Sequence, residues 1–357
     1  MSADRAAVPT GARTWLDPDW RAGALAWADR ELAARGLTRV GPAEQPHVRP
    51  WSTAIRLPTD LGPAWFKASG PGPAHEGLLL RVLAERGLPC VLLPMTVHPQ
   101  LPWLLFMDGG PTMRATRPDG TGDHEIAAWE RILAEYAGLQ RSVEAPEAIA
   151  AMLAAGTPDG RPARLAPELE RLVADDVIWG RLLPAEREAG LAARERLAHV
   201  VPEVRAAADR LAAAGVASSI QHDDLHGGNI LVGPDGDRIF DWGDAVVAHP
   251  FGTLTTTFNS IAHHTGRSLD DPIFGRLLDV YTEAWTDILQ RDELVELARL
   301  ASILGCIGKA LAWERSLGGL EPDEMDGHGD AVAGWLLEFA DRFSTPFLPD
   351  DPTRPPS

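Results

Sequence analysis

The chain has 357 residues, enough for two modest domains or for one two-lobed unit with a sizeable core. Its 51 acidic residues against 33 basic ones give a net charge of -18, which argues against general binding to nucleic acid, because such binding depends on Lys and Arg at phosphates. The charge is compatible with a cationic small-molecule partner, although a solvated acidic surface is the simpler explanation. No run approaches the ~20 apolar residues of a membrane helix, and the N-terminus carries no apolar signal core, so we expect a cytoplasmic protein without a membrane partner.

The two ends of the chain differ in composition from the rest. Residues 1–16 and 346–357 are rich in proline and polar residues, and we expect both to be flexible tails. A first helix is predicted to begin at Asp17, because Asp is a good N-cap and Pro18 follows at the first helical position. Gly36 is a suitable residue to end it.

Short strands and turns are predicted from about residue 46 to the Asp-Gly-Gly sequence at 108–110, which reads as a flexible joint. The expected order is strand, strand, helix, strand, strand, at residues 52–57, 64–68, 74–86, 91–93 and 103–107. Residues 17–108 are therefore expected to form a small mixed lobe.

The chain beyond this joint is predicted to be mainly helical, and residues 109–345 are expected to form one larger lobe. Apolar residues recur at helical spacing in five segments, residues 124–140, 184–214, 273–289, 291–317 and 331–343. The predicted fold class is therefore α+β, with two lobes. In such an arrangement the functional site usually lies where the lobes meet.

One compact non-helical stretch, residues 219–243, interrupts these helices and reads as a β-hairpin. A run of turn formers, Gly-Pro-Asp-Gly-Asp, is centred on Asp235 and lies between apolar, β-prone segments. If the five-residue loop is centred there, Ile230 pairs with Phe240. Asn229 then lies opposite Asp241, so an amide oxygen and a carboxylate meet at the open end of the hairpin.

These groups suit the chemistry of phosphoryl transfer. Asn229 and Asp241 offer hard oxygen ligands, and Asp224 adds a carboxylate in the preceding loop, a set that suits Mg²⁺. Phosphoryl transfer needs charge neutralisation, positioning, and one group that orients or deprotonates the attacking hydroxyl.

The spacing of these residues resembles that of a known family. His222, Asp224 and Asn229, followed after the hairpin by Asp-Trp-Gly from Asp241, resemble the catalytic loop and metal-binding motif of the protein-kinase-like fold. The motif Asp-Leu-His-Gly-Gly-Asn, followed by Asp-Trp-Gly-Asp, is most similar to that of the aminoglycoside phosphotransferase family. This family includes kinases of choline, homoserine and sugars. The resemblance implies an ATP- and Mg²⁺-dependent kinase of a small hydroxylated acceptor, with GTP as an alternative nucleotide.

The resemblance also implies a role for each matching residue. Asp224 would be the catalytic aspartate that accepts the proton of the acceptor hydroxyl, and Asn229 and Asp241 would hold Mg²⁺ at the nucleotide phosphates. Leu231 would form the floor under the adenine. His222 would support the catalytic loop without acting as an acid or a base.

The small lobe offers matching nucleotide contacts. The resemblance makes Lys67 the strand lysine that holds the α- and β-phosphates, and Glu76 the helix residue that holds this lysine. A hinge strand would read the adenine edge through the backbone of its last residues, Phe106, Met107 and Asp108. No GxGxxG precedes Lys67, so the backbone and hydroxyl groups near Ser52 and Thr53 are the remaining candidates for covering the phosphates.

A protein substrate is not expected. Protein kinases have Arg where this chain has Asp223, and no Ala-Pro-Glu follows Asp241 to close an activation segment. The phosphotransferase family itself usually has glycine at the position of Asp223.

Two other functions remain open at this point. His222, Asp224 and His226 also form an HxDxH pattern, which is compatible with a metal-dependent hydrolase. The third alternative is a nucleotide-binding module without catalytic activity.

Overall fold

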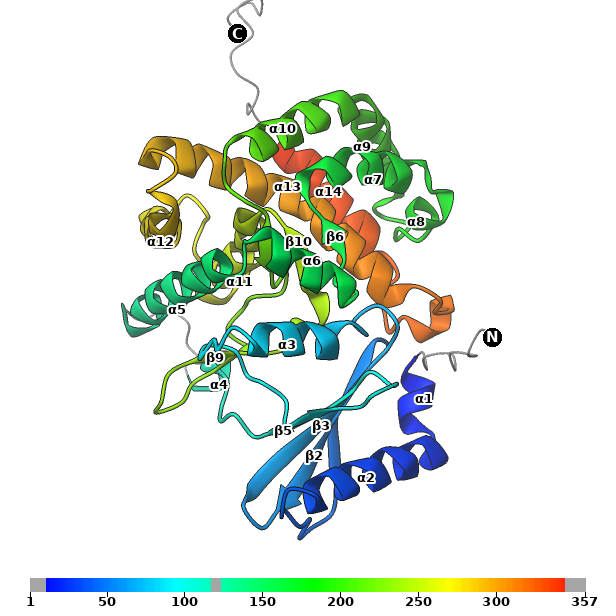
Figure 1. The fold of residues 1–357 in the computed structure, drawn as a ribbon. Helices are drawn as coiled ribbons and strands as arrows, with labels where there is room; N and C mark the ends of the chain where they lie inside the picture. Colours follow the sequence, from blue (N-terminus) through cyan, green and yellow to red (C-terminus); the bar gives the residue numbers. More distant parts are fainter. Residues whose placement is uncertain (1–10, 117–122, 344–357) are drawn as a thin grey trace, which may run out of the picture.

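The computed structural model describes residues 11–116 and 123–343. An antiparallel sheet with a helix across it forms one end of the molecule, and a mainly helical body forms the other (Figure 1). The predicted α+β fold with two lobes is therefore confirmed. The predicted lobe boundaries stay a prediction.

The small lobe is built on a five-stranded sheet with the strand order β1-β2-β3-β5-β4. The predicted strands at 52–57, 64–68 and 103–107 are present, whereas the strand predicted at 91–93 is wrong. Its apolar residues line the connection between lobes, where Val91 makes only an isolated bridge to Ile239. The strands are β1 (Glu44–Arg49), β2 (Ser52–Thr59), β3 (Gly62–Ser69), β4 (Thr96–Val97) and β5 (Trp103–Met107).

One face of this sheet is covered by α2 (Pro18–Ala33), which lies across it in Figure 1. The Asp17 carboxylate accepts a hydrogen bond from Trp20 N at 2.8 Å, so the predicted N-cap is present. Alternate strand residues form the apolar core beneath α2, among them Ile55, Phe66 and Leu105. Because side chains alternate along a strand, Lys67 lies on the opposite face, toward the large lobe.

The expected N-terminal tail is shorter than predicted. Residues 12–16 form helix α1 (Ala12–Leu16), and Trp15 is fully buried in the core of the small lobe. Its indole N–H donates to Arg49 O at 2.8 Å, which ties the chain to β1. A large aromatic side chain can thus anchor a segment whose composition looks flexible. Residues 1–10 and 346–357 lie outside the described residues.

The large lobe contains the predicted helices together with several shorter ones. The helix predicted at 184–214 is divided at Val200, because Pro202 lies in the first turn of the next helix and lacks the N–H that a continuous helix would need. None of the helices in the two described ranges is long and apolar enough to cross a bilayer. The helix expected in the small lobe is α3 (Glu76–Ala84). The helices that follow it are α4 (Met113–Thr116), α5 (Asp123–Ser142), α6 (Pro146–Ala154), α7 (Pro162–Ala174), α8 (Asp176–Gly180), α9 (Arg187–His199), α10 (Val201–Ala213), α11 (Leu254–Thr265), α12 (Pro272–Thr282), α13 (Arg291–Leu317) and α14 (Ala331–Phe343).

The predicted hairpin is present, but its register differs by one residue. Strands β8 (Ile230–Leu231) and β9 (Arg238–Ile239) pair Ile230 with Ile239, not with Phe240. The reason is the turn, in which Gly236 N donates to Gly233 O at 3.3 Å. A four-residue turn has its centre between two residues, whereas the predicted five-residue loop was centred on one. Asn229 therefore faces Phe240, the neighbour of Asp241.

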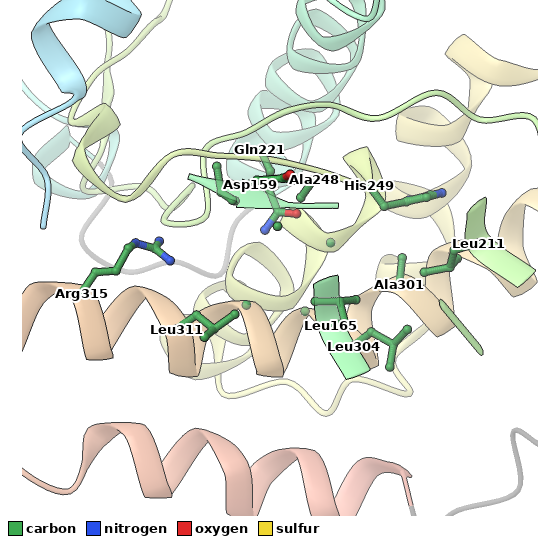
Figure 2. A pocket seen from close by; sticks show the side chains of 15 residues that line it. Asp159, Leu165, Leu211, Gln221, Ala248, His249, Ala301, Leu304, Leu311 and Arg315 are labelled. Carbon is green, nitrogen blue, oxygen red and sulfur yellow. The ribbon is translucent and has the colours of Figure 1, made fainter. Parts of the chain in front are cut away.

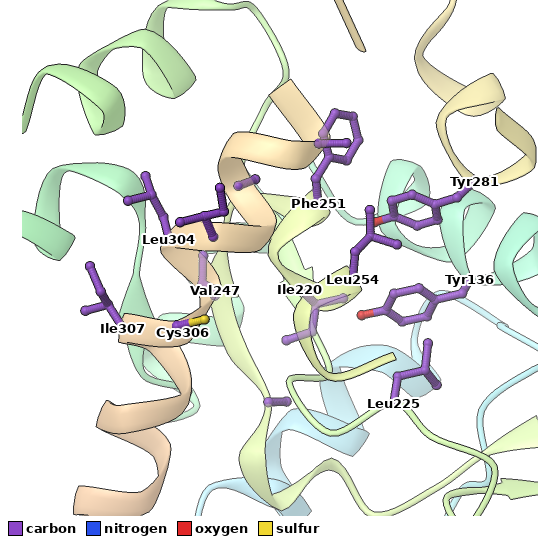
Figure 3. Close-up of a cluster of buried hydrophobic side chains, with 14 of the residues drawn as sticks. Tyr136, Ile220, Leu225, Val247, Phe251, Leu254, Tyr281, Leu304, Cys306 and Ile307 are labelled. Carbon is purple, nitrogen blue, oxygen red and sulfur yellow. The ribbon is translucent and has the colours of Figure 1, made fainter. Parts of the chain in front are cut away.

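The segment between β7 (Ser219–Gln221) and β8 lies on the main core of the large lobe. Figure 3 shows Leu225 and Ile220 in this core near Tyr136 of α5 and Leu254 of α11. The loop that carries Asp224 therefore has a buried, close-packed base. Such a base holds polar side chains in fixed positions.

Candidate active site

His222 is enclosed beneath the predicted catalytic loop. Its Nε2 lies 2.9 Å from Phe240 O, and its Nδ1 accepts a hydrogen bond from Asp224 N at 3.3 Å. Burial lowers the pKa of His222 to about 4, so the ring is neutral near pH 7. Both ring nitrogens are engaged inside the protein, which supports the predicted supporting role and disfavours a metal ligand.

Contacts surround the carboxylate of Asp224. Asn229 Nδ2 donates to Asp224 Oδ2 at 3.0 Å, and His226 Nε2 lies 3.3 Å from the same oxygen. Asp224 Oδ1 lies 3.7 Å from the ammonium nitrogen of Lys309, which belongs to α13. Burial raises the pKa of Asp224, but the charge of Lys309 and the bond to His226 outweigh it and hold this pKa well below its usual range. Asp224 is therefore an ionised carboxylate with a defined orientation.

The predicted pair of Lys67 and Glu76 is present and reaches the other side of the site. Lys67 Nζ lies 2.5 Å from Glu76 Oε2 and 2.6 Å from Asp241 Oδ1. Glu76 Oε1 also accepts a hydrogen bond from Trp242 N at 3.0 Å. Burial lowers the pKa of Lys67, but the two carboxylates outweigh it and the pKa is raised. One network of charged groups thus connects β3, α3 and the residues after the hairpin.

The predicted magnesium ligands fit a hard cation. The amide N–H₂ of Asn229 faces Asp224, so its oxygen points elsewhere, and the side chain of Asp241 is 46% exposed. An amide oxygen and a carboxylate are ligands that Mg²⁺ accepts together with phosphates and water. No group of three or more His, Cys, Asp or Glu in residues 11–116 and 123–343 forms a metal cluster, and the buried ring of His222 also speaks against the HxDxH hydrolase.

Only one of the two predicted phosphate-covering hydroxyls lies on the cleft face. Ser52 pairs with Ser69 and shares the face of Lys67, whereas Thr53 lies on the α2 face. The Thr53 hydroxyl donates to His47 O at 2.7 Å, so its side chain faces away from Lys67, and a contact of its backbone with phosphates stays a prediction. His47 itself, which the sequence analysis did not identify, lies in the same cross-strand row as Lys67. The alternation of side chains along β1 and β2 was the signal in the sequence that places Ser52 and His47 on the face of Lys67 and Thr53 on the other.

The predicted hinge residues, Phe106, Met107 and Asp108, close the small lobe at β5. Asp108 Oδ2 accepts a hydrogen bond from Trp65 Nε1 at 3.1 Å, and Asp108 N donates to Pro63 O at 2.9 Å. Leu231 is buried and its side chain lies against Gly109, which leaves no room for a Cβ there. The proposed contacts of these residues with a nucleobase stay predictions.

Asp223 adopts the backbone conformation that explains the usual glycine at its position. Its φ is 62°, in the left-handed region that Asp tolerates better than most residues. Gln221 Nε2 donates to Asp223 Oδ1 at 2.7 Å, and the carboxylate is buried. Burial raises the pKa of Asp223 to about 6.

An aromatic cluster joins the β1–β2 turn of the small lobe to the large lobe. Trp51, at the β1–β2 turn, lies edge-on to Trp313 of α13 with 5.3 Å between ring centroids. His328 stacks on Trp313 at 5.0 Å and contacts Trp51 at 5.3 Å. The turn next to Ser52 is therefore held against the large lobe.

A small cavity lies between α13 and the three-stranded sheet formed by β6 (Asp159–Gly160), β10 (Val246–Ala248) and β7 (Figure 2). It measures about 50 Å³, and Gln221, His249 and Arg315 contribute to its walls. This volume suits water rather than an acceptor molecule.

The comparisons with known proteins agree with this geometry. Residues 73–294 match the model of the phosphotransferase enzyme family, whereas no curated protein matches. The fold is similar to an ethanolamine kinase from Plasmodium vivax, at 12% identity and a TM-score of 0.59 over 91% of this chain and 89% of that one. It is also similar to a choline/ethanolamine kinase family protein from Mesorhizobium loti (16%, 0.52, over 90% and 98%) and to a macrolide 2'-phosphotransferase type I (15%, 0.52, over 87% and 96%). Because the family match spans more than half of the chain, the resemblance found in the sequence is confirmed: this chain belongs to the phosphotransferase enzyme family and is a small-molecule kinase.

Proposed function

We propose that the protein transfers the γ-phosphoryl group of ATP, in the presence of Mg²⁺, to a hydroxyl group of a small molecule. The observation that carries the proposal is a pair of contacts at the open end of the hairpin: Lys67 contacts Asp241, which follows the hairpin, and Asn229 contacts Asp224 in the loop before it. These contacts support a site that combines a cation, two oxygen ligands for a metal and a proton acceptor.

Each group has a task in this proposal. Asp224 orients the acceptor hydroxyl and takes up its proton as the oxygen attacks phosphorus, a role for which an ionised, fixed carboxylate is suited. Lys67 binds the non-reacting phosphates and is held by Glu76. Asn229 and Asp241 would hold Mg²⁺, which supplies charge neutralisation to the phosphates.

The acceptor class follows from the family only in outline. The named relatives include kinases of ethanolamine and of choline and a macrolide phosphotransferase, so amino alcohols, sugars and antibiotics with free hydroxyls are the first candidates. The net negative charge of the protein favours those members of these classes that are cationic. GTP as the alternative donor, the absence of nucleic acid and protein substrates, and a cytoplasmic location stay predictions.

The test is a screen for phosphorylated product. The purified protein is incubated with Mg-ATP and a panel of amino alcohols, sugars, aminoglycosides and macrolides, and products are identified by a mass increase of one phosphoryl group. We expect Asp224→Ala to abolish product formation while Mg-ATP still binds in calorimetry.

Asp235→Ala is the matched control, because Asp235 is an exposed carboxylate at the hairpin turn. Full activity of Asp224→Ala would overturn the proposal. Binding of Mg-ATP without turnover by any acceptor, or by water, would favour the inactive nucleotide-binding module.

A further inference from the structure

Lysine is rare in this chain. Lys67 and Lys309 are the only lysines among 357 residues, so the other 31 of the 33 basic residues are arginines. Arginine forms the ion pairs at the surface, for example between Arg39 and Asp29. Both lysines, in contrast, are buried or nearly so, and both contact carboxylates of the active site. An ammonium group is a compact point charge with three rotatable donors, whereas a guanidinium is a planar fork, so the two are not interchangeable at these positions.

Lys309 reaches the site from α13, more than 80 residues after the catalytic loop. Its side chain is 5% exposed, and its Nζ donates to Asp223 O at 2.8 Å. The same nitrogen lies 3.7 Å from Asp224 Oδ1 and 3.6 Å from Asp244 Oδ2. It therefore contacts the loop immediately before the catalytic carboxylate, that carboxylate itself, and the segment after the hairpin.

The position of Asp223 makes this contact important for the geometry of the loop. Asp223 has a φ of 62°, and its carbonyl oxygen accepts hydrogen bonds from Lys309 and from Thr256 Oγ1 at 3.0 Å. A left-handed non-glycine residue persists only where its surroundings hold it. The two donors fix the peptide group that precedes Asp224, and the direction of the Asp224 side chain depends on it.

The charges in this region also require Lys309. Asp223, Asp224 and Asp244 lie near its ammonium group, and Asp223 Oδ2 is buried without a hydrogen-bond partner in the part of the chain that the structure describes. Lys309 contacts both Asp224 and Asp244 from the side of the core, where α13 lies. Without it these three carboxyl groups would lose their shared cation, and their mutual Coulomb repulsion would displace the Asp224 carboxylate.

We propose that Lys309 is a positioning residue for phosphoryl transfer, which fixes the Asp223 peptide and the Asp224 carboxylate toward the acceptor and offsets the negative charge beside them. The proposal rests on the proposed function for its kinetic consequence, whereas the contact between Lys309 and Asp224 stands on the geometry alone.

The kinetic test uses Mg-ATP with water as the acceptor. Lys309→Met should lower kcat for ATP hydrolysis by about 10²-fold, because misplacing a catalytic group by ~1 Å has an effect of this size. The KM for ATP should stay unchanged, because Lys67 and Asp241 are untouched. A general loss of structure would instead change both parameters. Wild-type kcat in Lys309→Met would overturn the proposal.

Three further variants make the result independent of folding. Arg299→Met removes an exposed cation from the same helix and should leave kcat unchanged. Lys309→Met combined with Asp223→Gly removes one buried charge of each sign and places glycine at the left-handed position, so it should fold and remain slow. Lys309→Arg should also remain slow, and full activity in it would show that charge without position suffices, contrary to the proposal.

A second measurement does not depend on nucleotide. With ¹⁵N-lysine labelling, NMR shows two side-chain ammonium signals, and Lys309→Met identifies which belongs to Lys309. Asp224→Asn and Asp244→Asn should each shift the Lys309 signal, whereas Asp235→Asn should not. An unshifted signal would overturn the inferred contact. A wild-type protein that neither binds nor hydrolyses Mg-ATP would refute the proposed function instead, and the NMR result would still decide the contact.

Discussion

The two lysines of this protein lie at opposite sides of one active site and are held in different ways. Lys67 contacts the side chains of Glu76 and Asp241, and the Asp241 side chain is 46% exposed. Lys309 is almost fully buried and donates to a backbone carbonyl, Asp223 O. The ion pair of Lys67 can therefore exchange one partner for a bound phosphate or metal, whereas Lys309 belongs to the fixed frame. In the proposed function, the nucleotide side would rearrange and the acceptor side would stay in place.

The largest effect is expected at Asp241, the partner of Lys67 that a phosphate or a metal could replace. Asp241→Asn removes the charge of the proposed metal ligand, a change worth several kcal/mol, so turnover should fall by about 10³-fold. A titration of activity with MgCl₂ should show that the variant needs far more Mg²⁺. Asp235→Asn, at the exposed turn, is the control, and an unaltered magnesium dependence in Asp241→Asn would remove the ligand assignment.

A smaller effect should separate the two lysines directly. Lys67→Met leaves Glu76 buried without its cation and should weaken Mg-ATP binding by roughly 30-fold, equivalent to about 2 kcal/mol. Calorimetry with Mg-ATP measures this loss. The ammonium signal of Lys309 should stay at its wild-type position, and a shift of that signal would mean that the two sides are not independent.

The packing of α13, the helix that carries Lys309, can be tested through its glycines. A Cβ at Gly305 would collide with Thr255 Oγ1 and come within 3.0 Å of Gly252 O, so Gly305→Ala should lower the free energy of unfolding by about 1–3 kcal/mol. Gly308→Ala is the matched control in the same helix, since nothing lies within 4 Å of its added methyl group. Urea unfolding compares the two, and equal stabilities would contradict the close approach.

The last test concerns the dependence of stability on pH. Burial lowers the pKa of His249 to about 3, from an ordinary 6.5. The unfolded ring binds a proton below pH 6.5 while the folded ring remains neutral, so stability falls as the pH drops between these values, by about 1.4 kcal/mol per pH unit from this residue. His249→Gln should reduce the slope of unfolding free energy against pH between 6 and about 4. An unchanged slope would contradict the neutral, buried ring.

The sequence predicted what lies close along the chain. The catalytic loop and the hairpin place Asp224, Asn229 and Asp241 within 18 residues, so a local motif could identify them. Lys67 and Glu76 followed from the resemblance and meet in the structure. A site whose residues lie close along the chain can be identified from a sequence motif before the fold is known.

What the sequence did not predict depends on tertiary packing or on fine backbone geometry. The hairpin register followed from a turn in which Gly236 has a φ of 116°, and turn formers alone do not specify the loop length. Lys309 looked like an ordinary residue of the predicted helix at 291–317, although a lone lysine in an apolar run was a signal. Its partners are distant in sequence, and only the fold brings them together.

The aromatic contact between the lobes and the buried lysine belong to one helix. Trp313, against which Trp51 rests, follows Lys309 by one turn of α13. The same helix therefore contacts the β1–β2 turn of the small lobe through Trp313 and the Asp223 carbonyl through Lys309. A change in the seat of α13 would alter both contacts together.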